Sequence, residues 1–130
     1  MDIKLKEIDK DTLKVGDIVG IARDVSCGWS SSFRHRRIYS ARIAKITPKR
    51  TKIVSDKFGE HDKYEKFYEL DENAKLENEL AEAFETLQDG IYRLGELRRN
   101  DRIRSISDED VLEASKHVKA IMEIMEKCKE

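Results

Sequence analysis

The feature that most constrains this chain is a change of hydrophobic period near Leu70–Asp71, where the charge also changes sign. Before this point, apolar residues alternate or form short β-branched runs between turns, as in strands. After it, they recur at steps of three and four, as in helices. Residues 1–70 hold 16 Lys and Arg against 11 Asp and Glu, a net charge of +5, and residues 71–130 hold 10 against 16, a net charge of −6. The sequence therefore predicts a basic β-rich module over 1–70 and an acidic helical hairpin over 71–130.

Four short strands are expected in the first part. They are residues 18–23, 37–47, 51–55 and 65–70. Their β-branched or alternating composition favours strands, and the long second one has room for a bulge. Residues 26–36 are rich in Ser and Gly and are expected to form an exposed loop, and residues 58–62 a turn. Because no helix separates the strands, an antiparallel meander or small barrel is predicted.

The order of these elements resembles SH3-like β-barrels of the Tudor and KOW type. In that pattern a Lys-x-Gly-Asp-x-Val strand precedes a long variable loop and an Ala-x-Ile-x-x-Ile strand, and here Lys14–Val19 and Ala41–Ile46 match it. The resemblance covers about residues 12–70 and implies a fold, not an activity. Residues 46–52 are also similar to a segment of small uncharacterised β-barrel proteins that bacteriophages and prophages encode, which implies no functional residue.

Two helices are expected after Asp71, so the fold class is α+β. One face of the first carries Leu76, Leu80, Ala83, Phe84, Leu87, Ile91 and Leu94. Gly90 and Gly95 would either split this helix or bend it. Ser107 and the acidic residues after it resemble a capping box that starts the second helix. The helices are expected to pair antiparallel, and their wide apolar stripes would also cover the barrel or a second subunit.

The chain carries no motif that would identify an enzyme. It has no phosphate loop, nucleophile elbow or His-Glu-x-x-His motif, and Cys27 and Cys128 match no metal or redox spacing. His61 beside Asp62 is expected to be solvated. We therefore expect a binding protein with no cofactor and no metal. No apolar h-region or membrane-length apolar run occurs, so a cytoplasmic protein without a membrane partner is expected.

The segment between Phe33 and Ser55 suggests a nucleic-acid interface, because it holds eight Lys and Arg and no Asp or Glu. Cations neutralise phosphates, and aromatic faces stack on unpaired bases. The predicted nucleic-acid-binding residues are Trp29, Phe33, Arg34, Arg36, Arg37, Tyr39, Lys49, Arg50 and Lys52. The alternative is that this basic segment docks on the chain's own acidic helices.

Two protein-binding hypotheses stand beside this one. Glu77, Glu82 and Glu85 on the first helix would meet a basic protein; with the phage similarity, this suggests a regulator or inhibitor of a bacterial defence enzyme. Alternatively, Ile121, Met122 and Met125 on the second helix would join two copies in a homo-oligomeric structural component. The sequence leaves the choice between DNA, RNA and protein open.

Overall fold

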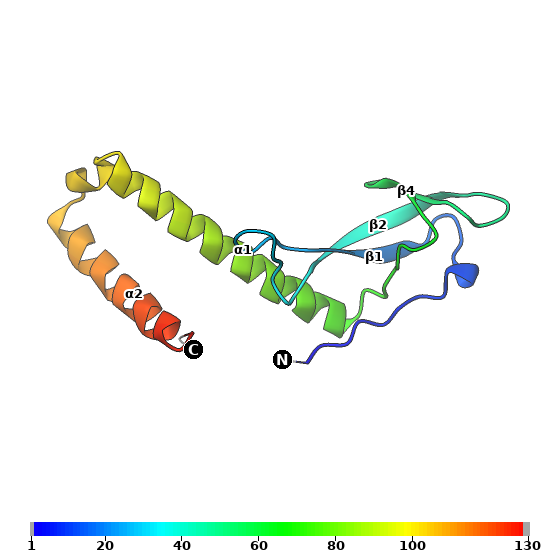
Figure 1. The fold of residues 1–130 in the computed structure, drawn as a ribbon, viewed down its shortest axis with the longest axis horizontal. Helices are drawn as coiled ribbons and strands as arrows, with labels where there is room; N and C mark the ends of the chain where they lie inside the picture. The colour runs from blue at the N-terminus through cyan, green and yellow to red at the C-terminus, as the bar shows by residue number, and fades with distance from the viewer. Residues whose placement is uncertain (1, 129–130) are drawn as a thin grey trace. The chain divides into compact units, whose positions relative to one another are not determined.

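The computed structural model describes residues 2–128 and contains a four-stranded antiparallel sheet and two long helices (Figure 1). Its elements are η1 (Lys10–Thr12), β1 (Ile18–Arg23), β2 (Arg37–Ile46), β3 (Ile53–Ser55), β4 (Gly59–His61), α1 (Glu72–Arg99), η2 (Arg102–Ser105) and α2 (Asp108–Glu126). The chain forms two compact units: one ends at Gln88 and the other begins at Asp89, so α1 is shared by both. We call described residues 2–88 the sheet unit and described residues 89–128 the helical unit.

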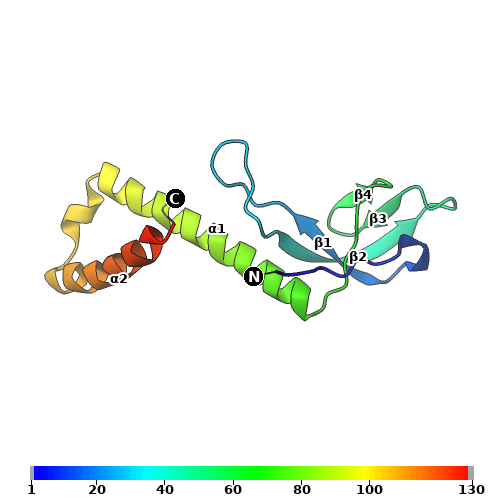
Figure 2. The ribbon, with the colours of Figure 1, turned by 60° about the horizontal axis from the view of Figure 1, so that its bottom comes forward.

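The predicted α+β class is confirmed, and the sheet is antiparallel in the order β1-β2-β3-β4 (Figure 2). It is not closed, so a barrel is not shown. The expected bulge in the long strand lies between Ile43 and Lys45. The predicted turn at 58–62 is wrong, because β4 occupies Gly59–His61 and pairs with β3. The predicted last strand at 65–70 is reduced to isolated bridges, in which Tyr68 pairs with Glu7 and Gly20.

The main core cluster lies on one face of this sheet, and the other face is partly covered as well, since Ile38 is 8% exposed. Its fully or nearly fully buried members are Leu13, Val19, Ile21, Ala41, Ile43, Ile53 and Phe67. Each large apolar side chain moved out of water contributes roughly 1.5–3 kcal/mol before the entropy of ordering the chain is subtracted. The inward-facing residues of β1 and β2 thus stabilise the β-rich part of the chain, in which apolar residues alternate along the strands.

The segment between β1 and β2 is a hairpin rather than an entirely exposed loop (Figure 2). Ser26 pairs with Ser32, and the Phe33 amide donates to the Val25 carbonyl at 2.8 Å. The tip turns through Gly28 at φ +67° and Ser30 at φ +57°. Residues 26–36 were predicted to be exposed, and this prediction is wrong at the end of the segment, where His35 is only 5% exposed.

Both helices begin at a capping side chain, and the cap of α2 is the predicted Ser107. The Asp71 carboxylate accepts from the Ala74 amide at 2.9 Å, and the Ser107 hydroxyl accepts from the Asp110 amide at 3.2 Å. Gly90 and Gly95 do not split α1, which runs unbroken from Glu72 to Arg99. No helix within residues 2–128 has the length and apolar character needed to cross a membrane.

Candidate functional site

The first end of the predicted basic segment packs against α1 in the same unit. Arg37 donates from Nη1 to Glu85 Oε1 at 2.7 Å and from Nε to Asn78 Oδ1 at 3.1 Å. The Asn78 oxygen also accepts from the Ile38 amide at 2.8 Å. The hydrogen bond to Glu85 raises the pKa of Arg37 above its ordinary value, although burial opposes the shift. Because the folded pKa is raised, the contribution of Arg37 is fully present below its ordinary pKa and is lost only above the physiological range.

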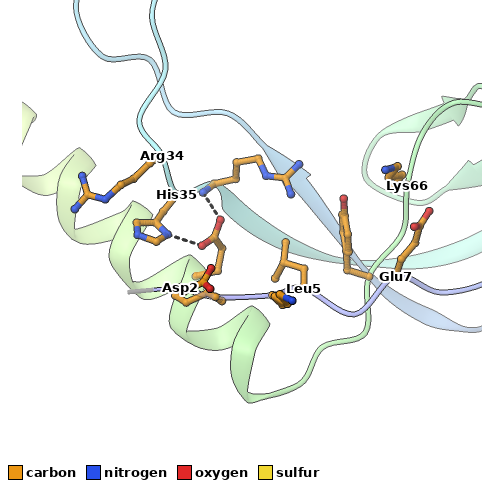
Figure 3. Close-up of a pocket in the computed structure, with 11 residues that line it drawn as sticks. Asp2, Leu5, Glu7, Arg34, His35 and Lys66 are labelled. Carbon is orange, nitrogen blue, oxygen red and sulfur yellow. Dashed lines mark hydrogen bonds and ion pairs between the residues drawn. The ribbon is translucent and has the colours of Figure 1, made fainter.

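Beside Arg37, the Glu77 carboxylate is held from two sides. Its Oε1 lies 2.6 Å from His35 Nδ1, and its Oε2 accepts from the Arg36 amide at 2.8 Å (Figure 3). Glu77 is 6% exposed and His35 is 5% exposed. A buried carboxylate needs such partners, because removing it from water without them is costly. The sequence predicts Glu77 on a protein-binding face, but in this structure it joins α1 to His35 and Arg36, just before β2.

Aromatic residues of the predicted nucleic-acid site are also engaged within the sheet unit. Phe33 stacks on Phe84 of α1, with ring centroids 3.9 Å apart and planes at 3°. Tyr39 meets Phe58 edge to face at 5.6 Å, and the Arg37 guanidinium lies over the Tyr39 ring at 5.2 Å. These faces are therefore already covered by neighbours within the chain.

Trp29 is the exception, because its side chain is 94% exposed at the tip of the hairpin between β1 and β2. The turn that carries Trp29 is closed by one backbone hydrogen bond, in which the Cys27 amide donates to the Ser31 carbonyl at 2.9 Å. A large apolar side chain in water is costly to leave uncovered, and tryptophan is a frequent anchor of interfaces. Of the three predicted stacking residues, Trp29 alone presents a free ring.

The second end of the basic segment lies beyond the far end of β2. Arg50, in the turn before β3, donates from Nη1 to the carbonyls of Lys10 and Leu13 at 3.0 and 3.1 Å. Lys52 pairs with Glu60 at 3.6 Å, and Lys49 is exposed. A ten-residue strand spans about 33 Å, so β2 separates the two ends instead of joining them in one patch.

A hollow of about 540 Å³ adjoins the Glu77 carboxylate on the sheet unit (Figure 3). The cations on its walls are Lys4, Arg34, Arg36 and Lys66. Asp2, Glu7 and Glu77 line the same hollow, so its charge is mixed. Arg36 lies over the Tyr68 ring at 5.5 Å, and Arg34 over Phe33 at 4.8 Å. The hollow therefore presents four cations beside three carboxylates, and the described residues hold no cluster that could bind a metal ion.

The predicted acidic face is divided by the same packing. Glu77 pairs with His35 and Glu85 with Arg37, whereas Glu82 is exposed. Residues 1–88 contain 17 Lys and Arg and 17 Asp and Glu, a net charge of zero. The acidic start of α1 therefore neutralises the basic β-rich module to which it is attached.

Ser55, His61 and Glu65 form a Ser-His-Glu arrangement at the β3–β4 hairpin that the sequence did not predict. Ser55 Oγ lies 2.8 Å from His61 Nε2, and His61 Nδ1 lies 3.3 Å from Glu65 Oε1. The expectation of a solvated His61 is wrong, because it is 4% exposed and Ser55 is 3% exposed. Ser55 Oγ also accepts from the Phe58 amide at 3.1 Å, and Arg23 pairs with Glu65 at 2.7 Å. Because Ser55 is buried, its hydroxyl is engaged in contacts that join the two strands of the hairpin.

The helical unit presents a different kind of surface. No residue of α2 is buried, and the buried residues of α1 all lie before Asp89. Ile121 and Met122 are 41% and 59% exposed, and Met125 is half-buried. The other large apolar residues exposed in this unit are Ile91, Tyr92, Leu94, Leu97, Ile103, Ile106, Val111, Leu112, Val118 and Ile124. Both helices thus carry apolar side chains without covering them.

Comparison with known proteins adds no relative. No family model matches the chain, and neither a curated protein nor a solved structure gives a match.

Proposed function

We propose that this chain is a non-enzymatic protein-binding module whose helical unit attaches it to another protein chain. The observation that carries the proposal is the exposure of the unit's large apolar side chains, with no buried residue in α2. Amphipathic helices draw most of their stability from burying an apolar face, and large exposed apolar patches mark interaction sites. The sheet unit has its own core, so it serves as the folded support for this surface.

A photo-crosslinking experiment tests this proposal directly. We would introduce p-benzoylphenylalanine at Leu94 of the helical unit and, as a matched control, at the exposed Lys75 in the first half of the same helix. Illumination should link a protein chain to position 94 and leave position 75 without an adduct. The absence of any protein adduct at position 94 and at a second position, Met122, would contradict the proposal.

Contact with single-stranded nucleic acid is a second candidate, favoured by the exposure of Trp29. Its indole is 94% exposed, and exposed Arg34 adjoins the hollow that Lys66 also lines. Proteins usually bind single strands by stacking bases on aromatic rings while Lys and Arg contact the phosphate backbone of the nucleic acid. The internal contacts of Phe33 and Arg37 reduce this site to the hairpin tip and the hollow.

Trp29 also supplies the measurement, because it is the only Trp in the chain. Titration with a single-stranded oligonucleotide should quench its fluorescence, and affinity should fall steeply with salt. Arg34→Glu with Lys66→Glu should weaken binding, whereas Lys57→Glu, another exposed lysine, should not. Unchanged fluorescence at low salt would exclude this candidate.

A further inference from the structure

The apolar seam of α1 lies on a different face from the one that packs on the sheet unit. Its positions alternate in steps of four and three: Leu76, Leu80, Ala83, Leu87, Gly90, Leu94 and Leu97. The buried residues of α1 are Ala74, Glu77 and Ala81, which lie about a third of a turn away at 100° per residue. Leu94 and Leu97 remain 54% and 37% exposed. A heptad seam of this kind indicates a helical partner. Leu76, Leu80 and Leu87 are half-buried in the sheet unit, so the uncovered part of the seam is the part that carries Leu94 and Leu97.

α2 carries a second seam with the same spacing. Its positions are Val111, Ser115, Val118, Met122 and Met125. Ile121 and Ile124 widen the apolar surface to about half of the helix circumference, and both are exposed. A strip this wide suits two helical neighbours rather than one, as in a four-helix bundle.

The charges of the helical unit complement one another. Residues 93–104 hold five Arg against two acidic residues, and α2 holds six acidic residues against two Lys. Arg98 and Arg102 form no ion pair with any residue in 2–128, and within the same range the carboxylates of the first turn of α2 form none either. Those carboxylates belong to Asp108, Glu109 and Asp110. Because this unit carries both cations and carboxylates that pair with no described residue, two copies can pair them in both directions.

We infer that the partner of the helical unit is a second copy of this chain, with α1 of one copy antiparallel to α2 of the other. This inference rests on the proposed protein-binding function of the unit. Residues 93–104 and the start of α2 adjoin the same connection, so antiparallel pairing sets Arg98 and Arg102 of one copy beside the acidic first turn of the other. Two-fold symmetry makes each contact twice and brings the apolar seams together. A surface that matches itself in both charge and seam favours a second copy over a foreign chain.

The first experiment measures association of the full chain by light scattering between about 1 and 200 µM. We expect the mass of a dimer at the upper end, and Leu94→Asp and Met122→Asp should each weaken association about tenfold or more. Tyr92→Asp is the matched control, because Tyr92 is exposed on the same helix but on the face opposite Leu94. Circular dichroism of every variant checks that the helices remain folded. Equal weakening by Tyr92→Asp would overturn the seam as the interface.

The second experiment separates pairing between copies from pairing within one chain. Arg98→Glu with Arg102→Glu gives one variant, and Asp108→Arg with Glu109→Arg gives another. Each alone should fail to dimerise, because like charges then face each other at both contacts. An equal mixture should dimerise, since both contacts of the mixed pair join opposite charges. If the mixture stays monomeric while the wild-type chain dimerises, the assigned arrangement is wrong.

A monomeric wild-type chain gives two distinguishable results when an apolar dye such as ANS is added. Dye binding that Leu94→Asp reduces shows an uncovered seam, which overturns the second copy as partner and leaves the proposed function standing with a different protein. A monomer that binds no dye has covered its seams within one chain. This result overturns both the second copy as partner and the proposed protein-binding function.

Discussion

The ring of Phe33 lies flat on the ring of Phe84, with centroids 3.9 Å apart and planes at 3°. Phe33 ends the hairpin between β1 and β2, whereas Phe84 lies in α1, so the stack joins the two halves that composition and period separate. Together with the Glu77 contacts, it explains why the sheet unit extends to Gln88 and not to the change of period at Leu70.

A double-mutant cycle on Phe33→Ala and Phe84→Ala should reveal a coupling free energy of about 0.5–1.5 kcal/mol beyond the area each ring buries. The measurement is urea unfolding of the two single variants and the double variant. Trp29→Ala is the aromatic control, because that ring is 94% exposed and its removal should change stability by less than about 0.5 kcal/mol. Additive losses at positions 33 and 84 would show that the rings do not interact.

Glu77→Ala should destabilise the sheet unit by about 3 kcal/mol or more, because it leaves a buried His35 and the Arg36 amide without their acceptor. Glu79→Ala is the matched control, since Glu79 is exposed two positions away on the same helix. Urea unfolding should therefore distinguish two glutamates that look equivalent in the sequence. Equal effects of the two substitutions would mean that the buried carboxylate adds nothing to stability.

The contrast between Glu77 and Glu79 also shows why part of this fold escaped prediction. β1 and β2 could be predicted because Val19, Ile21 and Ile43 follow a period of two that one buried face requires. β4 could not, because Gly59 favours a turn and His61 is polar. His61 enters the core only because Ser55 and Glu65 satisfy its two nitrogens, and such pairing is not visible in a local pattern.

Prediction of the candidate site from the sequence was limited for the same reason, because contacts between distant residues are not visible in a local pattern. Charge counting identified the basic segment, but Arg37 meets Glu85 only after α1 docks, and their separation along the chain hides the contact. Exposure of Trp29 follows from the Gly28 and Ser30 turn, which a Ser- and Gly-rich loop does indicate. The helical period places Met122 and Met125 on one face of α2 but does not say what covers that face, so their role as a binding surface stays a prediction.

Ser55 should not react with a fluorophosphonate probe, despite its hydrogen bond to His61. The hydroxyl belongs to a residue that is 3% exposed, so a reagent has no path to it. Ser55→Ala should instead reduce stability by about 1–3 kcal/mol, because the Phe58 amide and the His61 ring lose a partner. Mass spectrometry after probe treatment checks the first expectation and urea unfolding the second. Stoichiometric labelling of Ser55 in the folded chain would show that the network is accessible and reopen an enzymatic interpretation.

Two glycine-to-alanine substitutions should change stability in opposite directions. A Cβ at Gly20 would lie 3.0 Å from Leu70 Cδ2 and 3.1 Å from both Ile38 Cγ2 and the Tyr68 carbonyl oxygen, so these neighbours must move by a few tenths of an ångström. Gly20→Ala should therefore cost about 1–3 kcal/mol, as overpacking does.

At Gly90, inside α1, a Cβ would meet no atom within 4 Å. Gly90→Ala should stabilise the helix by up to about 1 kcal/mol, because alanine loses less backbone freedom on folding. Thermal unfolding monitored at low protein concentration compares both variants with the wild-type chain. Destabilisation by Gly90→Ala under those conditions would show that position 90 meets a close neighbour in solution. Stabilisation by Gly20→Ala would show that β1 is not held against Tyr68.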